Sequence, residues 1–393
     1  MDEFLRYAKK IVMRIVLFPL RMIPIRKNRV LFHNDLARNY SDSPKFVAEY
    51  LRSHYEGQFD LIFSVKDPQA NAFLLERGIQ PVKFNSFRYF LSAISAQVLV
   101  TNSGGFSYVP LRKKQYVVNT WHGGGAYKKC GIYMYNNTPL FRRNLRLAGD
   151  ATDAFLSTCS RFTDVISESM LVPKTAFWEI GMPRNDMMIH PNATVREEVR
   201  QKLGLKENEK ILLFAPTYRK IDDNYFKDSI AISYGVDSER VCKAMEKRFG
   251  GKWRFAFRFH PCVTNRDELP QGDYMDLSDY PDMQELLCAA DAMLNDFSSS
   301  MWDFMLTGRP SFLFAVDLEH YVKTTQVYTP VSEWPFPKAV NNDELEKNIL
   351  EFDEQAYRAA CECHYKALGG CETGQATQLV CERIFEQCFG TNA

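Results

Sequence analysis

The chain has 393 residues, 46% of them hydrophobic, which is enough for about two domains with sizeable cores and excludes a disordered or fibrous protein. Its 49 basic and 48 acidic residues leave a formal net charge of +1, so no global basic field indicates nucleic-acid binding. Any site for an anion must therefore be local.

Residues 1–27 differ in pattern from the rest of the chain. Apolar residues recur at helical spacing between Phe4 and Val16. The cations that interrupt them are Arg6, Lys9, Lys10 and Arg14. No run approaches the ~18 to 20 uncharged apolar residues that a spanning helix needs. We predict a basic amphipathic arm whose cations contact an anionic membrane surface; the alternative is a helix packed on the protein's own surface.

Strand-like and helical segments alternate after this arm. The strand-like segments are 29–33, 59–65, 81–84, 97–103, 115–121 and 154–160, and the helical ones are 45–55, 71–78, 87–96 and 161–171. A second series with the same alternation begins near Lys210. This pattern predicts parallel sheets covered by helices on both faces.

The expected fold class is therefore α/β, with two doubly wound, Rossmann-like domains that face a cleft into which the carboxyl ends of both sheets point. We place the N-terminal domain at 28–180, the C-terminal domain at 181–342 and closing helices at 343–393.

The segment NTWHGGGAYKKCG (119–131) follows the strand-like run QYVV. His122 therefore falls where a strand opens into a loop, and imidazole is a side chain that commonly abstracts a proton from a hydroxyl at neutral pH. Gly123 and Gly124 allow a tight turn and close approach of a substrate, while Lys128 and Lys129 add positive charge for an anionic one. A structural His-Gly turn is the alternative.

Two segments of the second series deliver polar groups at strand ends. FAPTYRK (214–220) presents Thr217 and Arg219. In FRFHPCV (257–263), alternation places Arg258 and His260 on one face, opposite the phenylalanines. Both can donate to phosphate oxygens, and a protonated His260 could assist a leaving phosphate.

A third segment, LNDFSSSMWDFMLTGRP, contains Asp296 and the serines Ser298, Ser299 and Ser300 at the expected start of a helix that runs to Thr307. Hydroxyls and backbone N–H groups at a helix start bind anions. Ordinary N-capping, which needs one of the three serines, is the alternative.

Ten cysteines include five between Cys361 and Cys388. Because no secretory signal precedes them, we expect reduced thiols in the cytoplasm. Zinc ligation by the CECHYKALGGC segment is a weaker alternative, since its spacing is not a standard one. The sequence also lacks GxGxxG, GxxxxGK[ST] and Asp-x-Asp patterns, so we predict a transfer that uses neither metal nor cofactor.

In combination, TWHG with KK, MPRND, APTYR, RFHP and NDFSSSMWDF through GRP resemble the CDP-glycerol glycerophosphotransferases of teichoic acid and capsule synthesis. The resemblance implies a GT-B architecture with the acceptor side and base in the N-terminal domain and the CDP-alditol donor in the C-terminal one. It implies transfer of glycerol phosphate from CDP-glycerol to a hydroxyl of a lipid-linked or polymeric acceptor, with release of CMP, at the cytoplasmic face of the cell membrane.

The resemblance also implies roles for single residues. By this resemblance, His122 corresponds to the general base, and Arg219, Arg258 and His260 correspond to residues that hold the pyrophosphate. Ser298–Ser300 match the phosphate-binding helix start. The MPRND match adds Arg184, Asn185 and Asp186 to the acceptor or phosphate vicinity. Gly124 and Gly125 stand where family members commonly have Thr-Pro, which leaves the acceptor open.

Other functions remain open at this point. They are a ribitol-phosphate transferase of the same family, a GT-B glycosyltransferase or nucleotide-sugar 2-epimerase, and a membrane-attached protein that binds an anionic polymer without catalysis. Product analysis separates these, because glycerophosphate transfer leaves a phosphodiester and CMP.

Overall fold

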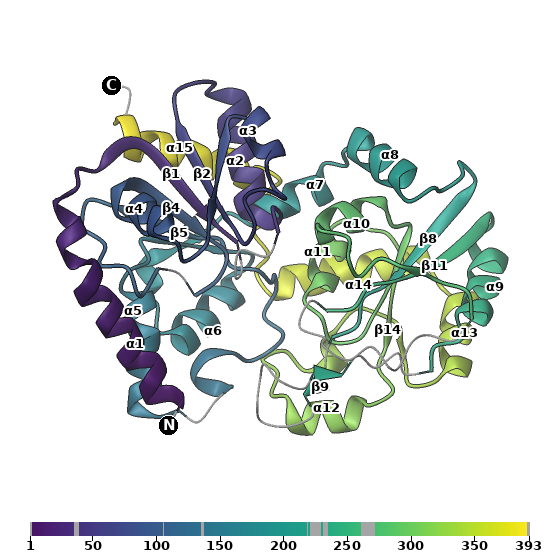
Figure 1. Ribbon diagram of the computed structural model, residues 1–393. Helices are drawn as coiled ribbons and strands as arrows, with labels where there is room; N and C mark the ends of the chain where they lie inside the picture. The colour runs from purple at the N-terminus through teal and green to yellow at the C-terminus, as the bar shows by residue number, and fades with distance from the viewer. Residues whose placement is uncertain are drawn as a thin grey trace. The chain divides into compact units, whose positions relative to one another are not determined.

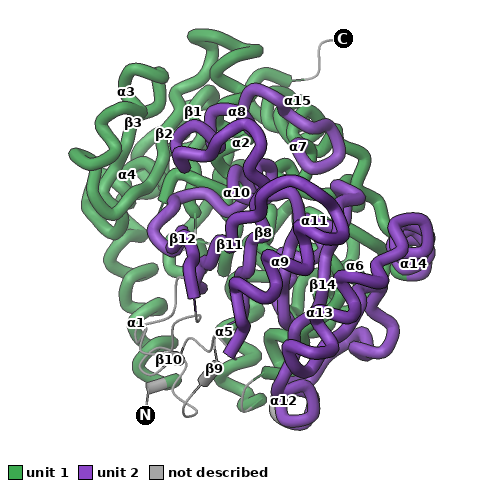
Figure 2. The backbone as a smooth tube through the Cα atoms, turned by 90° about the vertical axis from the view of Figure 1, so that its right-hand side faces the viewer, with its two compact units in different colours: residues 1–186, 368–393 green, residues 187–367 purple. Residues whose placement is uncertain are grey.

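The computed structural model describes residues 2–34, 39–104, 106–134, 137–217, 219–220, 229–230, 235–260 and 272–390, with the backbone alone for 2, 219–220, 229–230 and 324. The chain forms two compact units (Figure 2). Unit 1 comprises residues 1–186 and 368–393, and unit 2 comprises 187–367. The predicted closing segment 343–393 is thus divided between the units, and the predicted domain limits remain predictions.

Unit 1 is built on a seven-stranded parallel sheet with the order β3-β2-β1-β4-β5-β6-β7 (Figure 1). The strands are β1 (Arg26–His33), β2 (Asp60–Val65), β3 (Ile79–Lys83), β4 (Ala96–Thr101), β5 (Tyr116–Asn119), β6 (Ala154–Ser157) and β7 (Phe177–Glu179). The strand order reverses between β1 and β4. Ligands of open α/β sheets bind at the carboxyl ends of the strands beside such a reversal.

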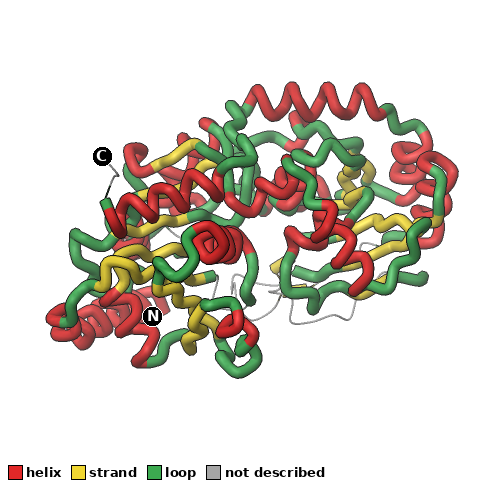
Figure 3. The backbone as a smooth tube through the Cα atoms, turned by 90° about the horizontal axis from the view of Figure 1, so that it is seen from above, coloured by secondary structure: helices red, strands yellow, loops and turns green. Residues whose placement is uncertain are grey.

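Helices cover both faces of this sheet (Figure 3). Val30 and Phe32 of β1 pack against α2 (Asp42–His54) and α15 (Ala376–Phe389), while Leu31 packs against α4 (Phe87–Ser95). Because neighbouring side chains of a strand point to opposite faces, a strand buried on both sides reads as a continuous apolar run. The other helices are α3 (Phe73–Glu76), α5 (Pro139–Gly149) and α6 (Ser160–Met170).

Local capping residues set several helix starts. Ser86 accepts a hydrogen bond from the Tyr89 N–H at the start of α4. Thr138 does the same for the Phe141 N–H at the start of α5, which has a proline in its first turn. Such caps satisfy N–H groups that have no partner within the helix, and proline loses nothing there.

Unit 2 contains a six-stranded parallel sheet with the order β12-β11-β8-β13-β14-β15. Its strands are β8 (Glu209–Phe214), β11 (Lys252–Phe257), β12 (Met275–Asp276), β13 (Ala292–Asn295), β14 (Ser311–Phe314) and β15 (Lys338–Ala339). Its helices are α7 (Asp186–Ile189), α8 (Ala193–Lys202), α9 (Ser238–Phe249), α10 (Met283–Ala289), α11 (Ser300–Met305), α12 (Leu318–Thr324), α13 (Asn342–Leu350) and α14 (Glu354–Ala367). β9 (Arg219–Lys220) and β10 (Ser229–Ile230) form an antiparallel pair. The order reverses between β8 and β13, so the same geometric rule applies.

The N-terminal arm forms α1 (Asp2–Leu17) and the 3-10 helix η1 (Phe18–Met22). Two of its four predicted membrane cations contact the protein instead. Lys10 Nζ donates to Asn144 Oδ1 at 2.7 Å, and Arg14 Nη1 donates to the carbonyl oxygens of Ser107 and Val109. Among the described residues, no helix is both long enough and apolar enough to cross a membrane.

The nine cysteines that the structure describes are free thiols. Cys361 is buried in α14 of unit 2, whereas Cys371 belongs to unit 1. Within the described ranges, no three His, Cys, Asp or Glu side chains gather as a metal site would require.

Candidate active site

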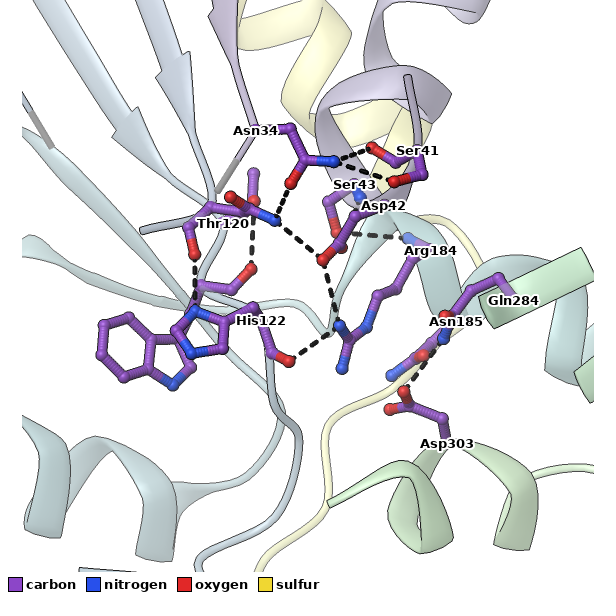
Figure 4. Close-up of polar contacts among 12 residues, drawn as sticks. Asn34, Ser41, Asp42, Ser43, Thr120, His122, Arg184, Asn185, Gln284 and Asp303 are labelled. Carbon is purple, nitrogen blue, oxygen red and sulfur yellow. Dashed lines mark hydrogen bonds and ion pairs between the residues drawn. The ribbon is translucent and has the colours of Figure 1, made fainter. Parts of the chain in front are cut away.

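His122 lies just beyond the carboxyl end of β5, and its side chain is exposed (Figure 4). Its Nδ1 lies 2.7 Å from the carbonyl oxygen of Asn102. A carbonyl oxygen only accepts hydrogen bonds, so Nδ1 carries the proton of the neutral ring, and Nε2 keeps its lone pair. The ring therefore presents a proton acceptor on its other nitrogen, as a general base must.

The residue before the base has a strained backbone. Trp121 has a φ of 53°, in the left-handed region that large side chains rarely adopt. Its N–H donates to Asn119 Oδ1 at 2.9 Å, and its ring stacks on His122 with centroids 4.5 Å apart. The neighbouring contacts thus hold a turn that orients the imidazole.

The three glycines after His122 differ in burial. Gly125 has a φ of 66°, and its N–H donates to Thr158 Oγ1 at 3.0 Å, so this N–H is not available to a ligand. Gly124 is buried and Gly123 half-buried. Lys128 and Lys129 are half-buried, and Lys129 Nζ lies 5.3 Å from the centre of the Tyr133 ring. Acceptor contact by these residues remains a prediction.

A polar network supports the His122 loop from behind (Figure 4). Arg184 Nη1 donates to the His122 carbonyl oxygen at 2.9 Å and pairs with Asp42 Oδ2 at 3.3 Å. Asn102, whose carbonyl oxygen bonds His122, donates from Nδ2 to the same Asp42 oxygen and to Asn34 Oδ1. Arg184 is 5% exposed, so its pair with Asp42 is largely shielded from water, which strengthens the hydrogen bonds of the network.

The other MPRND residues bond elsewhere in unit 1. Asn185 Nδ2 donates to Glu372 Oε1 at 2.6 Å, and the two carboxylate oxygens of Asp186 accept the N–H groups of Ala376 and Thr377. These contacts fix the start of α15. In the described contacts, only Arg184 of the three predicted residues reaches the His122 loop.

In unit 2, Asp296 follows β13 and is fully buried. Its Oδ1 accepts the N–H of Thr217 at 2.8 Å, the Thr217 hydroxyl at 2.9 Å and the N–H of Phe297. The carboxylate thereby joins the loops after β8 and β13, the two strands at the reversal of this sheet. Thr217, 5% exposed, is part of this frame.

The serines beside it form a small turn. Ser298 Oγ lies 3.0 Å from Ser300 Oγ and accepts the Ser300 N–H, and all three serines are half-buried. The helix α11 begins at Ser300 and ends at Met305, two residues short of the predicted end, because the last turn tightens at Thr307 and Gly308. Phosphate binding by the serines remains a prediction.

The predicted cations differ in burial. β11 ends at Phe257, so its alternation does not extend through His260: Arg258 and Phe259 are both buried, and His260 is half-buried. Arg258 Nη2 donates to the Tyr280 carbonyl oxygen at 3.0 Å, and burial lowers the pKa of its guanidinium. The Arg219 side chain lies outside the described residues.

A family model described as CDP-Glycerol:Poly(glycerophosphate) glycerophosphotransferase matches residues 15–386. The chain belongs to this family. The predicted family is thus confirmed, and with it, at the level of the family, the predicted class of enzyme.

Known members of this glycerophosphotransferase family cover most of the chain. The chain is 27% identical over 372 residues to the teichoic acid glycerol-phosphate transferase of Staphylococcus aureus. That alignment covers 92% of this chain and 93% of the relative. The chain is 26% identical over 374 residues to the teichoic acid poly(glycerol phosphate) polymerase of Staphylococcus epidermidis, and there it spans only 51% of the relative's length. Ribitol-phosphate polymerases also match, at 24% identity.

A solved structure of the wall teichoic acid polymerase TagF superposes with a TM-score of 0.81 and 24% identity, covering 98% of this chain and 97% of that one. The likeness confirms the predicted GT-B-like fold of two Rossmann-like domains.

The residues that support these two sheet edges were not found from the sequence. They are Asn34, Asp42 and Asn102 behind His122, and the buried pair Gln284 and Asp303, in which Nε2 donates to Oδ2 at 2.9 Å and braces α10 against α11. One signal was present: Asn34 and Asn102 each follow a buried apolar strand directly, where polar side chains gather in such folds.

Proposed function

We propose that this chain transfers glycerol phosphate from CDP-glycerol to a hydroxyl of a teichoic-acid-type polymeric or lipid-linked acceptor and releases CMP. The observation that carries the proposal is the hydrogen bond from His122 Nδ1 to the Asn102 carbonyl oxygen, which leaves Nε2 as a proton acceptor on an exposed ring. Family membership supplies the donor class.

In the proposed reaction the acceptor hydroxyl gives its proton to His122 Nε2 while its oxygen attacks the phosphorus that carries glycerol. A new phosphodiester bond forms, the bond from that phosphorus to the bridging pyrophosphate oxygen breaks, and CMP leaves with the bond's electron pair. A positioned general base is worth about 10²- to 10⁴-fold in rate.

The donor side is proposed to lie at the carboxyl edge of the unit 2 sheet. Ser298, Ser300 and His260 are half-buried, and Asp296 and Arg258, which also follow strands of this sheet, are buried. Hydroxyls and an imidazolium donate to phosphate oxygens, and a cation nearby stabilises negative charge on the departing CMP. We assign Arg219 to the same role.

The membrane part of the proposal rests on the orientation of α1. Its face toward the protein makes polar contacts and also packs Met13 and buried Leu17 against the core of unit 1. Glu3 accepts the Thr138 hydroxyl, and Lys10 and Arg14 bond as described above. Its outward face is apolar, with five large side chains more than half exposed, namely Phe4, Leu5, Val12, Ile15 and Val16. A helix of this kind gains free energy by burying its apolar face in a bilayer interface, with exposed Arg6 and Lys9 near anionic headgroups.

We therefore place the enzyme peripherally on the cytoplasmic face of the membrane. Replacing Val12 and Val16, which are both more than half exposed, with Gln should reduce flotation with phosphatidylglycerol vesicles. The matched control is Val322→Gln on α12, which is 44% exposed and lies in unit 2. Equal flotation of all variants would contradict the membrane assignment.

The test of the reaction is CMP release from CDP-glycerol by the purified chain with a glycerol phosphate acceptor, with CDP-ribitol and UDP-sugars as competing donors. The expected product is a phosphodiester extended by one glycerol phosphate. Turnover of CDP-ribitol in preference to CDP-glycerol would reassign the alditol, and turnover of a UDP-sugar without CMP would overturn the function.

A further inference from the structure

Three arginines on α5 form a cationic surface that the reaction above does not use. Arg143 and Arg146 are exposed and Arg142 is half-buried. Within the described part of the chain, none of the three lies within ion-pair distance of a carboxylate. Arg142 Nε donates to Asn137 Oδ1 at 2.6 Å, and Arg143 lies over the Tyr7 ring at 6.0 Å from its centre. Like charges four residues apart on a helix, such as Arg142 and Arg146, lower the stability of the helix, and a bound anion would offset their repulsion.

These arginines connect two regions already described. On one side, Lys129 from the loop after His122 lies over the Tyr133 ring, and the Tyr133 hydroxyl donates to Glu168 Oε1. The Glu168 hydrogen bond raises the pKa of this phenol, and the charge of Arg142 opposes that shift. On the other side, Arg143 contacts Tyr7 of α1, and Lys10 of α1 bonds Asn144 of α5. Figure 1 shows α1 and α5 side by side. Cations and aromatic rings thus continue from the His122 loop along α5 to the apolar arm.

We infer that the outward face of α5 binds the phosphodiester backbone of the growing glycerol phosphate chain and guides it between α1 and His122. This inference rests on the proposed function and names a binding surface for its acceptor. A glycerol phosphate repeat has six backbone bonds, as many as two amino-acid residues, and so spans at most about 7 Å. Residues one helical turn apart, such as Arg142 and Arg146, have Cβ atoms roughly 5 to 6 Å apart, so successive arginines match successive phosphates.

The composition of α5 favours the polymer over lipid headgroups. No large apolar side chain of the described α5 residues is exposed, whereas five are exposed on α1. Binding in a membrane interface requires buried apolar area as well as positive charge. Guanidinium groups without such area fit a hydrated polyanion, which they contact through bidentate hydrogen bonds.

The test measures binding of fluorescent glycerol phosphate oligomers, a dimer and an octamer, to the full-length chain with Arg142, Arg143 and Arg146 all replaced by Gln. We expect the octamer to bind about tenfold more weakly and the dimer to lose less affinity, because the two phosphates of a dimer match at most two of the three arginines, whereas the octamer can contact all three. The difference between the proteins should shrink at high salt. The matched control removes the same charge from unit 2, by Lys202→Gln, Lys243→Gln and Lys247→Gln, and should bind the octamer as the unmodified protein does.

Three outcomes separate the possibilities. Equal octamer binding by the α5 variant and the control variant would overturn the inference. Unchanged octamer binding with reduced flotation on phosphatidylglycerol vesicles would show that α5 contacts lipid, which also overturns it. Because binding is measured without CDP-glycerol, a chain that binds the octamer through α5 but releases no CMP would uphold the surface and contradict only the transfer reaction.

Discussion

The carboxyl edges of the two sheets are built in opposite ways. At the edge of unit 1, the candidate base His122 is exposed and its supports Arg184 and Asn102 are buried. At the edge of unit 2, the charged groups Arg258 and Asp296 are themselves buried, and the serines after Asp296 are half-buried. The first arrangement suits a group that moves a proton, and the second suits a fixed field for an anion. The two sheets share a reversal of strand order, but they differ in whether the charged side chains at the carboxyl edge are exposed or buried.

The strongest test of this comparison is His122→Ala. We expect CMP release to fall by about 10²- to 10⁴-fold, because the acceptor hydroxyl loses its base. Stability should not change, since the side chain is exposed. His54→Ala, at an exposed position of α2, is the control. A variant that kept most of its rate would remove His122 from the mechanism.

A second test asks whether the unit 1 edge depends on an uncharged histidine. His33, at the end of β1, is 5% exposed, bonds Ser64 Oγ through Nδ1 and stacks on Phe84. Burial lowers its pKa to about 4. Protonation therefore favours the unfolded chain, whose His pKa is near 6.5, so this contribution is present above about pH 6.5 and is lost as the pH falls towards 4.

The expected loss is roughly 3 kcal/mol across that window. His33→Gln should flatten this part of the pH dependence, which urea unfolding followed by circular dichroism at a series of pH values would measure. The same acid slope in both proteins would mean that another group titrates there.

For the unit 2 edge, the corresponding test is Asp296→Ala. Three donors from Thr217 and Phe297 would lose their acceptor, and leaving buried donors unsatisfied costs about 1 to 3 kcal/mol of unfolding free energy. Glu351→Ala, at an exposed position after α13, should be neutral. A stability loss no larger than that of the control would show that Asp296 does not hold the two loops together.

The smallest expected effect concerns the supports of His122. Arg184→Gln should lower kcat roughly tenfold while the Kd for CDP-glycerol stays constant, because the imidazole is less well positioned. Asp42→Asn should act in the same way, and the double variant should lose little more than the worse single one, since both belong to one network. Additive losses, or a weaker Kd for CDP-glycerol, would argue against a positioning role.

The sequence located the strands and the candidate base because buried parallel strands are apolar runs that end abruptly in polar residues. It did not reveal the network behind His122, since Asp42 pairs with Asn102 and Arg184, residues 60 and 142 positions away. The sequence also did not show which face of α1 points away from the protein, because its apolar and basic residues share helical spacing. Only the tertiary contacts show that Lys10 and Arg14 point toward the rest of unit 1.

The helix α15 closes the core of unit 1 from the far end of the chain. Val380 and Ile384 pack with Val30 and Val98 in one buried cluster, although unit 2 intervenes in the sequence. During synthesis, unit 2 leaves the ribosome before α15, so that one face of the unit 1 sheet is covered by α2 but not yet by α15. Because exposed apolar surface promotes aggregation, the translation of α15 should set the moment at which the core of unit 1 is protected from misassembly.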